Sequence, residues 1–507
     1  MRGDSEMMFS AKRIACTVVA LCAIIVGVSA ASAEEGVHLD PASVKDMVIE
    51  QSFGVKQVEM DRAAAAEVIP TAKGIFDTFL SGSAGYQMNK EKQINPIFGT
   101  RTDTVQWNLG LQKELSPTGT TLGLSLDSEW TKTSGSFQVG GNPIIPSFGR
   151  YEPVLGITLQ QPLMKNAFGM NDRGGVQEAR HAYASADQAV RYEIDKLVYL
   201  ALQDYWRLFF IREHMKAIDR AVSFAREFLN TAFEERKLGT AEETDVLAAR
   251  ANLLGRQNEY SAYKELEEVA EEALRNDLEL DPDQALLLSS RYPPKVRHLE
   301  SVESMISRAM ANRGDYLAAI EEIERQRVRV KMARNSRWPQ LDLVSTLDLN
   351  EIDRSYGDAL GDMDSPNLTA GLMLSVPLEN RAARAGARKA EAERARTVYA
   401  AKDLEKKIAN EIARLAVAIG ERLTIVEQTQ QALSLHLEKQ KLELGKYRMG
   451  RSSSDLVKRY QDDTVDTQRN LFEAWLAYKK SILDLKFALG MMVAESGEIS
   501  EQTEVGK

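Results

Sequence analysis

Cysteine is nearly absent from this chain: its 507 residues include only Cys16 and Cys22. Both lie in a leading segment in which two basic residues precede an apolar run that ends in the small residues Ala31–Ala33. This order is typical of a secretory signal peptide. We expect cleavage before Glu34, so the mature protein has neither disulfides nor thiol chemistry.

The alternative to cleavage is a membrane anchor, but an apolar run of about 17 residues is at the short end for a transmembrane helix. Cys22 follows Leu21 rather than a small residue, so we expect no lipid attachment. The opening residues MRGDSEM are unusual before a signal peptide, and Met7 and Met8 are alternative starts.

Long hydrophobic runs are missing after Ala33, so no later segment is expected to cross a membrane as a helix. Membrane β-strands give only a weak alternating signal, which leaves an outer-membrane location open. The formal net charge is −10. This acidity argues against nucleic acid as a partner.

Motifs for catalysis and metal binding are missing as well. The sequence contains no nucleophile motif, phosphate-binding loop or zinc signature. Its five histidines have no metal-ligand spacing and are expected on the surface: His38, His181, His214, His298 and His436. These absences predict a protein that is not an enzyme and has no cofactor and no metal site.

Proline is absent from two long tracts, one within residues 163–281 and one after Pro377. Because proline breaks helix interiors, these tracts can hold long helices. Apolar residues recur at steps of three and four in residues 194–232 and 408–433, as along a helix seam. A helix over residues 177–237 spans on the order of 90 Å. We therefore expect an elongated helical structure rather than a globule.

Short segments of alternating apolar and polar residues indicate strands with one apolar side. The expected strands cover residues 75–86, 105–115, 121–130, 154–161, 341–349 and 368–376. The second and third strands form an additional hairpin around the turn Ser116-Pro117-Thr118-Gly119.

Each long helical tract ends at a glycine, in KLGTAEETDVLAAR around Gly239 and in YRMGRSSSDLVKRY around Gly450. Glycine readily ends a helix, and helical patterns resume after both turns. We expect two helical hairpins with these turns as tips. The tips belong to a repeat in which Pro162 corresponds to Pro377, and Pro70 corresponds to Pro339 at the start of the first strand.

The predicted organisation is a signal peptide followed by two structural repeats and a polar tail. Their expected limits are residues 1–33 for the signal peptide, 34–290 for the first repeat, 291–491 for the second and 492–507 for the tail. Each repeat reads helix, strands, long helix, tip, helix. The strands lie at about 74–161 and about 341–376, and the tips lie near 239 and 450.

The order and duplication of these motifs resemble the TolC-like outer membrane efflux proteins, from about Leu39 to Gly490. The resemblance rests on the paired tips, on the strand ends LQQPL and LSVPL, and on ALQDYWRLFF and ANRGDYLAAIEEIERQRVRVKMARNSRWPQLDL. It implies an α+β membrane protein, a homotrimer with one shared β-barrel that continues as a long periplasmic α-helical coiled-coil barrel. Independently, a few strands cannot close a barrel, and open strand edges are not tolerated in lipid.

The resemblance also assigns residues to a gate at the periplasmic mouth and to tips that dock an adaptor. The gate residues are Asp245, Tyr447, Arg451, Asp455 and Lys458, and the docking residues are Leu238, Gly239, Thr240, Met449, Gly450 and Ser452. The second tip is expected to be one residue shorter, and Lys458 stands where a second acid often occurs. Alternatively, Asp245 and Asp455 are ordinary acids in the first turn of a helix.

The implied function is passive export through an outer-membrane duct, with a periplasmic adaptor and an inner-membrane pump or ABC transporter as partners. A periplasmic adaptor is the alternative, but an adaptor has one hairpin in a lipoyl-like domain, and a coiled-coil spacer leaves the strands unexplained. The sequence specifies neither the cargo nor the pump. It also leaves open whether the extra hairpin enters the wall, for 18 strands per trimer instead of 12, or lies outside the membrane.

Overall fold

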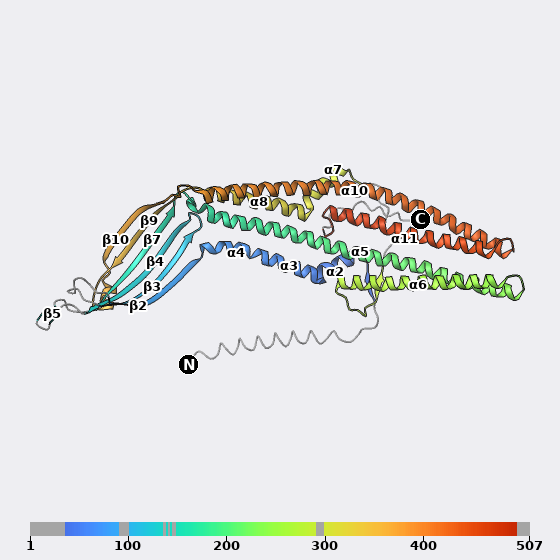
Figure 1. Cartoon of the computed structure of the whole chain (residues 1–507), viewed down its shortest axis with the longest axis horizontal. Coiled ribbons are helices and arrows are strands. Elements are labelled where there is room, and N and C mark those ends of the chain that lie inside the picture. The colour runs from blue at the N-terminus through green and yellow to red at the C-terminus, as the bar shows by residue number, and fades with distance from the viewer. Residues whose placement is uncertain are drawn as a thin grey trace, which may run out of the picture.

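The computed structural model describes residues 36–90, 101–134, 138–139, 142–143, 149–289 and 299–493. The predicted signal peptide, His298 and most of the polar tail lie outside these residues. The chain is elongated, with a sheet at one end and two helical tips at the other (Figure 1).

Two long helical hairpins make up most of the length. The first pairs α5 (Met170–Lys237) with α6 (Glu243–Leu278), and the second pairs α10 (Arg381–Arg448) with α11 (Ser454–Ala488). α5 and α10 have 68 residues each, which corresponds to about 100 Å. α11 packs against α5, so the two hairpins lie side by side.

Shorter helices pack along the long ones, from the middle of the molecule to the sheet. α2 (Pro41–Gln51), α3 (Phe53–Ala66) and α4 (Val68–Lys73) pack along α5. α7 (Val302–Asn312) packs on α10, and α8 (Gly314–Asn335) lies between α5 and α10. No helix among the described residues has an apolar stretch long enough to cross a lipid bilayer.

The expected equivalence of Pro70 and Pro339 is wrong. Pro339 directly precedes a strand, but Pro70 is the third residue of α4 and is followed by a 3₁₀ turn, η1 (Gly74–Phe76). The first backbone N–H groups of a helix need no partner within the helix, so proline is tolerated there. The first strand of the sheet therefore starts only at Thr78.

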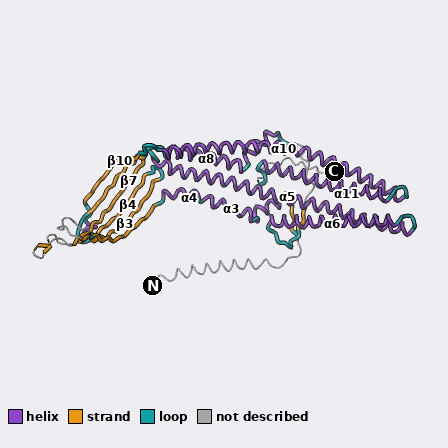
Figure 2. Tube along the Cα trace, viewed as in Figure 1, coloured by secondary structure: helices purple, strands orange, loops and turns teal. Residues whose placement is uncertain are grey.

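The sheet, orange in Figure 2, has six strands, and all neighbours are antiparallel. The strands are β2 (Thr78–Asn89), β3 (Arg101–Leu115), β4 (Thr120–Ser134), β7 (Gly149–Pro162), β9 (Gln340–Asn350) and β10 (Ser365–Ser375). Their order is β10-β9-β7-β4-β3-β2. The additional hairpin, β3–β4, is thus part of the sheet.

Several small elements flank the long helices and the sheet. β1 (Val37–Leu39) and β8 (Leu286–Leu288) form a parallel pair beside the helices. β5 (Gln138–Val139) pairs with β6 (Asn142–Pro143), and α9 (Tyr356–Gly361) lies in the connection from β9 to β10. α9 packs on β7 at the end of the sheet away from the helices.

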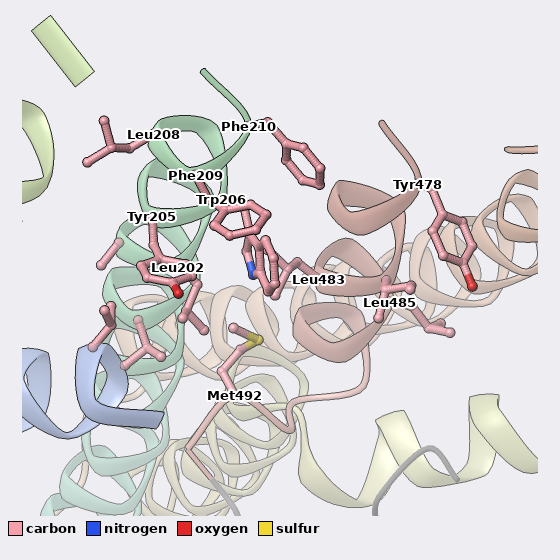
Figure 3. Packing of buried hydrophobic residues seen from close by; sticks show 14 of the residues in the cluster. Leu202, Tyr205, Trp206, Leu208, Phe209, Phe210, Tyr478, Leu483, Leu485 and Met492 are labelled. Atoms are coloured by element: carbon pink, nitrogen blue, oxygen red, sulfur yellow. The ribbon is translucent and has the colours of Figure 1, made fainter. Parts of the chain in front are cut away.

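The main core lies where the hairpins meet the shorter helices (Figure 3). Tyr205 and Leu208 of α5 and Tyr478 and Leu485 of α11 are fully buried there. Trp206 packs edge-on against Phe209, with ring centroids 5.5 Å apart. The long helices are therefore anchored to each other in the middle of the molecule.

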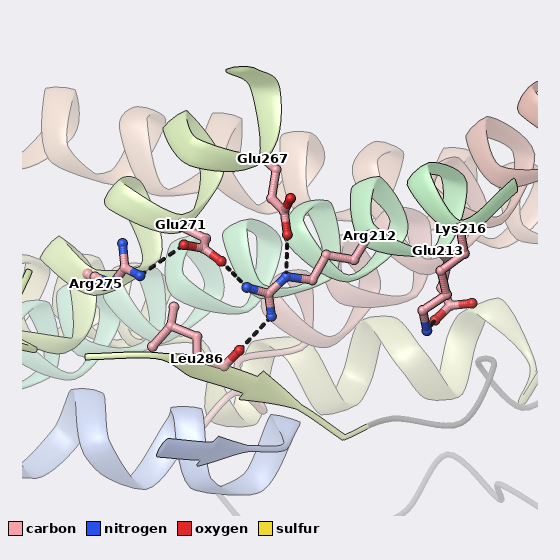
Figure 4. Close-up of polar contacts among 7 residues, drawn as sticks. All are labelled: Arg212, Glu213, Lys216, Glu267, Glu271, Arg275 and Leu286. Carbon is pink, nitrogen blue, oxygen red and sulfur yellow. Dashed lines mark hydrogen bonds and ion pairs between the residues drawn. The ribbon is translucent and has the colours of Figure 1, made fainter. Parts of the chain in front are cut away.

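A half-buried arginine ties β8 to the first hairpin (Figure 4). Arg212 donates to Glu267 at 2.8 Å, to the carbonyl of Leu286 at 2.6 Å, and to Glu271. Arg275 also donates to Glu271, at 2.9 Å. Charge-assisted bonds from a planar guanidinium fix relative orientation, so the β1–β8 pair is held against α5 and α6.

A carboxylate pair between α5 and α6 makes stability depend on pH. Burial, and then the neighbouring Asp204, raise the pKa of Asp277 to about 6. The folded chain therefore holds a proton that the unfolded chain releases at about pH 4. This contribution to stability is complete below that pH and is lost as the pH rises through about 6.

We expect Asp277→Asn to raise the melting temperature at pH 7.5 and to flatten its fall between pH 4 and 7. Circular dichroism melts at several pH values measure this. Asp281→Asn, at an exposed position just after α6, is the control and should leave the profile unchanged. An unaltered slope in Asp277→Asn contradicts the assignment.

Candidate functional site

Both tips end their helix in the same way. Gly239 and Gly450 have left-handed backbones, with φ of 74° and 69°. Each glycine N–H bonds the carbonyl three residues back, and the next N–H, of Thr240 or Arg451, bonds the carbonyl five residues back. This is the Schellman motif, which closes both helices at a glycine.

The expectation that the second tip is one residue shorter is wrong. α6 begins at Glu243 and α11 begins at Ser454, each four residues after the tip glycine. Both tips end the first helix in the same Schellman motif and begin the second helix at the same distance from the glycine, so the two turns have equal length. Asp455 is therefore equivalent in position to Thr244 rather than to Asp245.

The tip apices are exposed, while polar side chains brace the turns from within. Leu238 is 78% exposed and Met449 is 63% exposed. The Thr240 hydroxyl donates to the carbonyl of Glu235 at 2.9 Å, and the Ser452 hydroxyl donates to Glu443 at 2.6 Å. The apolar apices are thus presented on rigid turns.

Two hydrogen bonds join the unlike tips within one chain. The Tyr447 hydroxyl donates to Glu235 Oε2 at 2.6 Å, and the Ser454 hydroxyl donates to Asp245 Oδ1 at 3.0 Å. Burial, and then the bond to the Glu235 carboxylate, raise the pKa of Tyr447. A small apolar cluster lies beneath these bonds, made of Phe228, Ala232, Val246, Ala249 and Val457.

The structure brings two of the five predicted gate residues, Asp245 and Tyr447, into this contact. Asp245 also accepts from the backbone N–H of Glu242 at 3.0 Å, so it starts the helix α6 as well. Sequence reasoning missed both partners. Glu235 lies four residues before Gly239 in the last turn of α5, and Ser454 is the first residue of α11, positions that face the neighbouring tip.

The other three predicted gate residues lie at the same end without joining this contact. Arg451 is exposed and follows the tip glycine. Asp455 bonds Arg459 at 3.3 Å along its own helix. Lys458 is half-buried one turn further along α11. Within one chain, Asp245 is paired with Ser454 instead of Arg451.

His214 is buried, contrary to the expected surface position. Its ring packs edge-on against Tyr263 and Phe472, with centroids 4.4 and 5.5 Å away, and burial lowers its pKa. It occupies a position in the apolar seam of α5. In the part of the chain that the structure describes, no three His, Cys, Asp or Glu side chains are grouped to hold a metal ion.

One face of the six-stranded sheet is apolar and exposed. The strand register aligns one apolar residue from every strand in a single row across this face. The row consists of Leu80, Leu111, Leu124, Ile157, Leu347 and Leu368, all of them exposed. An apolar surface that extends uncovered across all six strands marks contact with a membrane or another protein.

The opposite face of the sheet is mostly polar. The adjacent row consists of Ser81, Gly110, Ser125, Gly156, Asp348 and Asn367. On this face Asp127 accepts from Ser125 at 2.9 Å and from Asn108. The alternation along each strand therefore separates a face suited to lipid from a face suited to water.

The sheet has two open edges and a marked stagger. β2 and β10 are its edge strands, and with six antiparallel strands they run in opposite directions. In the apolar row, Leu80 is the third residue of β2 counted from the end near the helices. Leu368, in the same row, is the fourth residue of β10 counted from the opposite end of the sheet. The register of the strands therefore shifts steadily from one edge of the sheet to the other.

Comparisons with known proteins find this arrangement in solved structures only. No protein-family model matches the sequence, and no curated protein matches it. The CmeC outer membrane channel of Campylobacter jejuni is 15% identical with a TM-score of 0.64, covering 91% of this chain and 87% of that chain. The outer membrane protein VceC of Vibrio cholerae is also 15% identical with a TM-score of 0.64, covering 89% and 96%.

The MtrE outer membrane channel of Neisseria gonorrhoeae, solved in an open state, is 13% identical with a TM-score of 0.65 and covers 89% of each chain. At these identities the similarity establishes the fold. The chain has the fold of TolC-like outer membrane channels, which confirms the resemblance at that level.

The bond between Tyr447 and Glu235 predicts coupled effects of substitution. Tyr447→Phe and Glu235→Gln should each speed amide hydrogen exchange in residues 447–454 by roughly tenfold, because a hydrogen bond to a charged group contributes roughly 1.5 kcal/mol or more. The double variant should exchange little faster than either single one. Tyr399→Phe, at an exposed position far from the tips, is the control. Additive effects would show that the two side chains act separately.

Proposed function

We propose that this chain, with the fold of TolC-like channels, forms the outer-membrane duct of a tripartite efflux or type I secretion system. It conducts cargo passively from a partner pump across the periplasm and the outer membrane, and it is not an enzyme. One observation carries the proposal: a sheet with an exposed apolar face and a polar face continues directly into helices about 100 Å long. The similar solved channels support it.

The duct is a homotrimer in outer-membrane lipid, and the number three rests on the resemblance. Because the edge strands run in opposite directions, β10 of one copy can pair antiparallel with β2 of the next around a closed ring. All backbone groups at the edges are then bonded, as lipid requires. At the helix end of β10, Trp338 and Val376 line an open hollow of about 760 Å³, which apolar Ile75 beside β2 of the next copy can enter.

The helices form a large periplasmic part whose tips dock onto an adaptor. Leu238 and Met449 offer exposed apolar contacts beside the rigid turns at Gly239 and Gly450. The adaptor in turn connects the duct to an inner-membrane pump or an ABC transporter. No observation favours the alternative that the chain is itself an adaptor, because it has two hairpins and a six-stranded amphipathic sheet.

The gate lies where the tips of neighbouring copies meet. Within one copy, Tyr447 and Ser454 already hold the two tips together. Arg451 is exposed and can reach Asp245 of the next copy. The first tip, GTAEETD, has three acids and no base, whereas GRSSSD has one of each, so unlike tips attract. The open state of the Neisseria gonorrhoeae channel supports a mouth that opens and closes.

The first test is location and assembly. We expect the protein in the outer-membrane fraction, released by detergent but not by salt, as a trimer that dissociates into monomers on heating in dodecyl sulfate. Membrane fractionation and gel electrophoresis with and without heating measure this. A soluble periplasmic monomer would refute the duct.

The second test addresses the gate in planar bilayers. An isolated surface ion pair is worth only about 0 to 1 kcal/mol, but threefold repetition multiplies its effect on one concerted opening. Asp245→Ala, Arg451→Ala and Tyr447→Phe should each raise conductance and make cells more sensitive to large antibiotics such as vancomycin. Lys458→Asp should strengthen block by divalent cations.

Lys441→Ala, at an exposed position before the tip, is the control and should conduct like the unmodified protein. Unchanged conductance in all three gate variants, with normal trimer levels, would contradict the assignment of the gate to these residues. It would not contradict the proposal that the chain forms a duct.

A further inference from the structure

The inserted hairpin β3–β4 lies in the interior of the sheet. β2 pairs with β3 from Thr78 to Asn89, and β4 pairs with β7 from Thr121 to Lys132. Without the hairpin, β2 and β7 would still be antiparallel neighbours. The hairpin therefore adds two strands to the width of the sheet and leaves the direction of every other strand unchanged.

The turn of this hairpin is fixed to the start of a long helix. Gly119 in the turn and Gly169, just before α5, both have left-handed backbones, and a Cβ on either would overlap the backbone of the other. Arg173 of α5 donates to the carbonyls of Pro117 and Phe168, at 2.6 and 2.5 Å. The hairpin is thus seated where the sheet meets the helices, as its neighbouring strands are.

The hairpin also has the same two faces as the rest of the sheet. Leu109 and Leu124 are exposed on the apolar face, in register with strands on either side. Ser125 and Asp127 lie on the polar face. A hairpin outside the membrane would have no need of an exposed apolar face that continues the neighbouring strands.

We propose that β3–β4 is part of the membrane wall of the duct, so that each copy contributes six strands. This inference rests on the proposed function. The trimer then has 18 strands, a number that leaves an aqueous channel in porins. Because the diameter of a barrel grows roughly in proportion to its number of strands, the wall is wider than one of 12 strands.

Cysteine labelling tests the place of the hairpin, since the chain has no cysteine after Cys22. With a thiol reagent confined to lipid, Leu109→Cys and Leu124→Cys should react within about threefold of the rate of Leu372→Cys on β10. Ser125→Cys should react only with a water-soluble reagent. Labelling of Leu372→Cys without labelling of the two hairpin positions overturns the inference and leaves the duct intact. If Leu372→Cys also fails to react, the proposed function falls too.

Electron cryomicroscopy of the detergent-extracted full-length protein tests the number of strands. We expect 18 strands in the wall, and a wall of 12 strands with β3–β4 outside it contradicts the inference. In a variant in which an Asn-Gly turn replaces residues 90–148 and joins β2 to β7, the strand wall should shrink to about two thirds while the helix wall is unchanged. An unchanged strand wall in that variant also overturns the inference.

Discussion

The uncovered apolar face of the sheet is the constraint on which the rest of the structure depends. No helix among the described residues covers the row from Leu80 to Leu368, so the surroundings of the protein must cover it. A lipid environment meets this need but forbids unpaired backbone groups at β2 and β10. The polar opposite face, the open edges and the stagger of the strands all agree with closure by further copies around a water-filled interior.

The long helices are stabilised by local contacts, and their stability does not limit their length. Each long helix satisfies its own backbone groups, and its apolar seam packs against its hairpin partner. Tyr205, Tyr478 and the other residues of the main core join the hairpins in the middle of the molecule. The tips are held separately by the small cluster around Phe228 and Val457. The tips can therefore rearrange without disturbing the core.

Patterns within short stretches of sequence predicted much of this fold. Missing prolines located α5 and α10, alternation located the six strands, and Gly239 and Gly450 marked the tips. The failures involve contacts between distant residues or fine spacing. Pro70 fits the first turn of a helix as well as the start of a strand, and His214 is buried by partners from other helices. The position of β3–β4 in the sheet, and the bond from Tyr447 to Glu235, depend on pairing that no local pattern specifies.

The antiparallel order of the sheet also limits how such a protein can evolve. Every strand carries the chain from one end of the sheet to the other, so a single inserted strand would place the following helix at the end of the sheet opposite the other helices. A complete hairpin such as β3–β4 leaves all later helices where they were. Gene insertions that survive selection at this site should therefore come in pairs of strands, and the number of strands per chain in proteins with this fold should differ in steps of two.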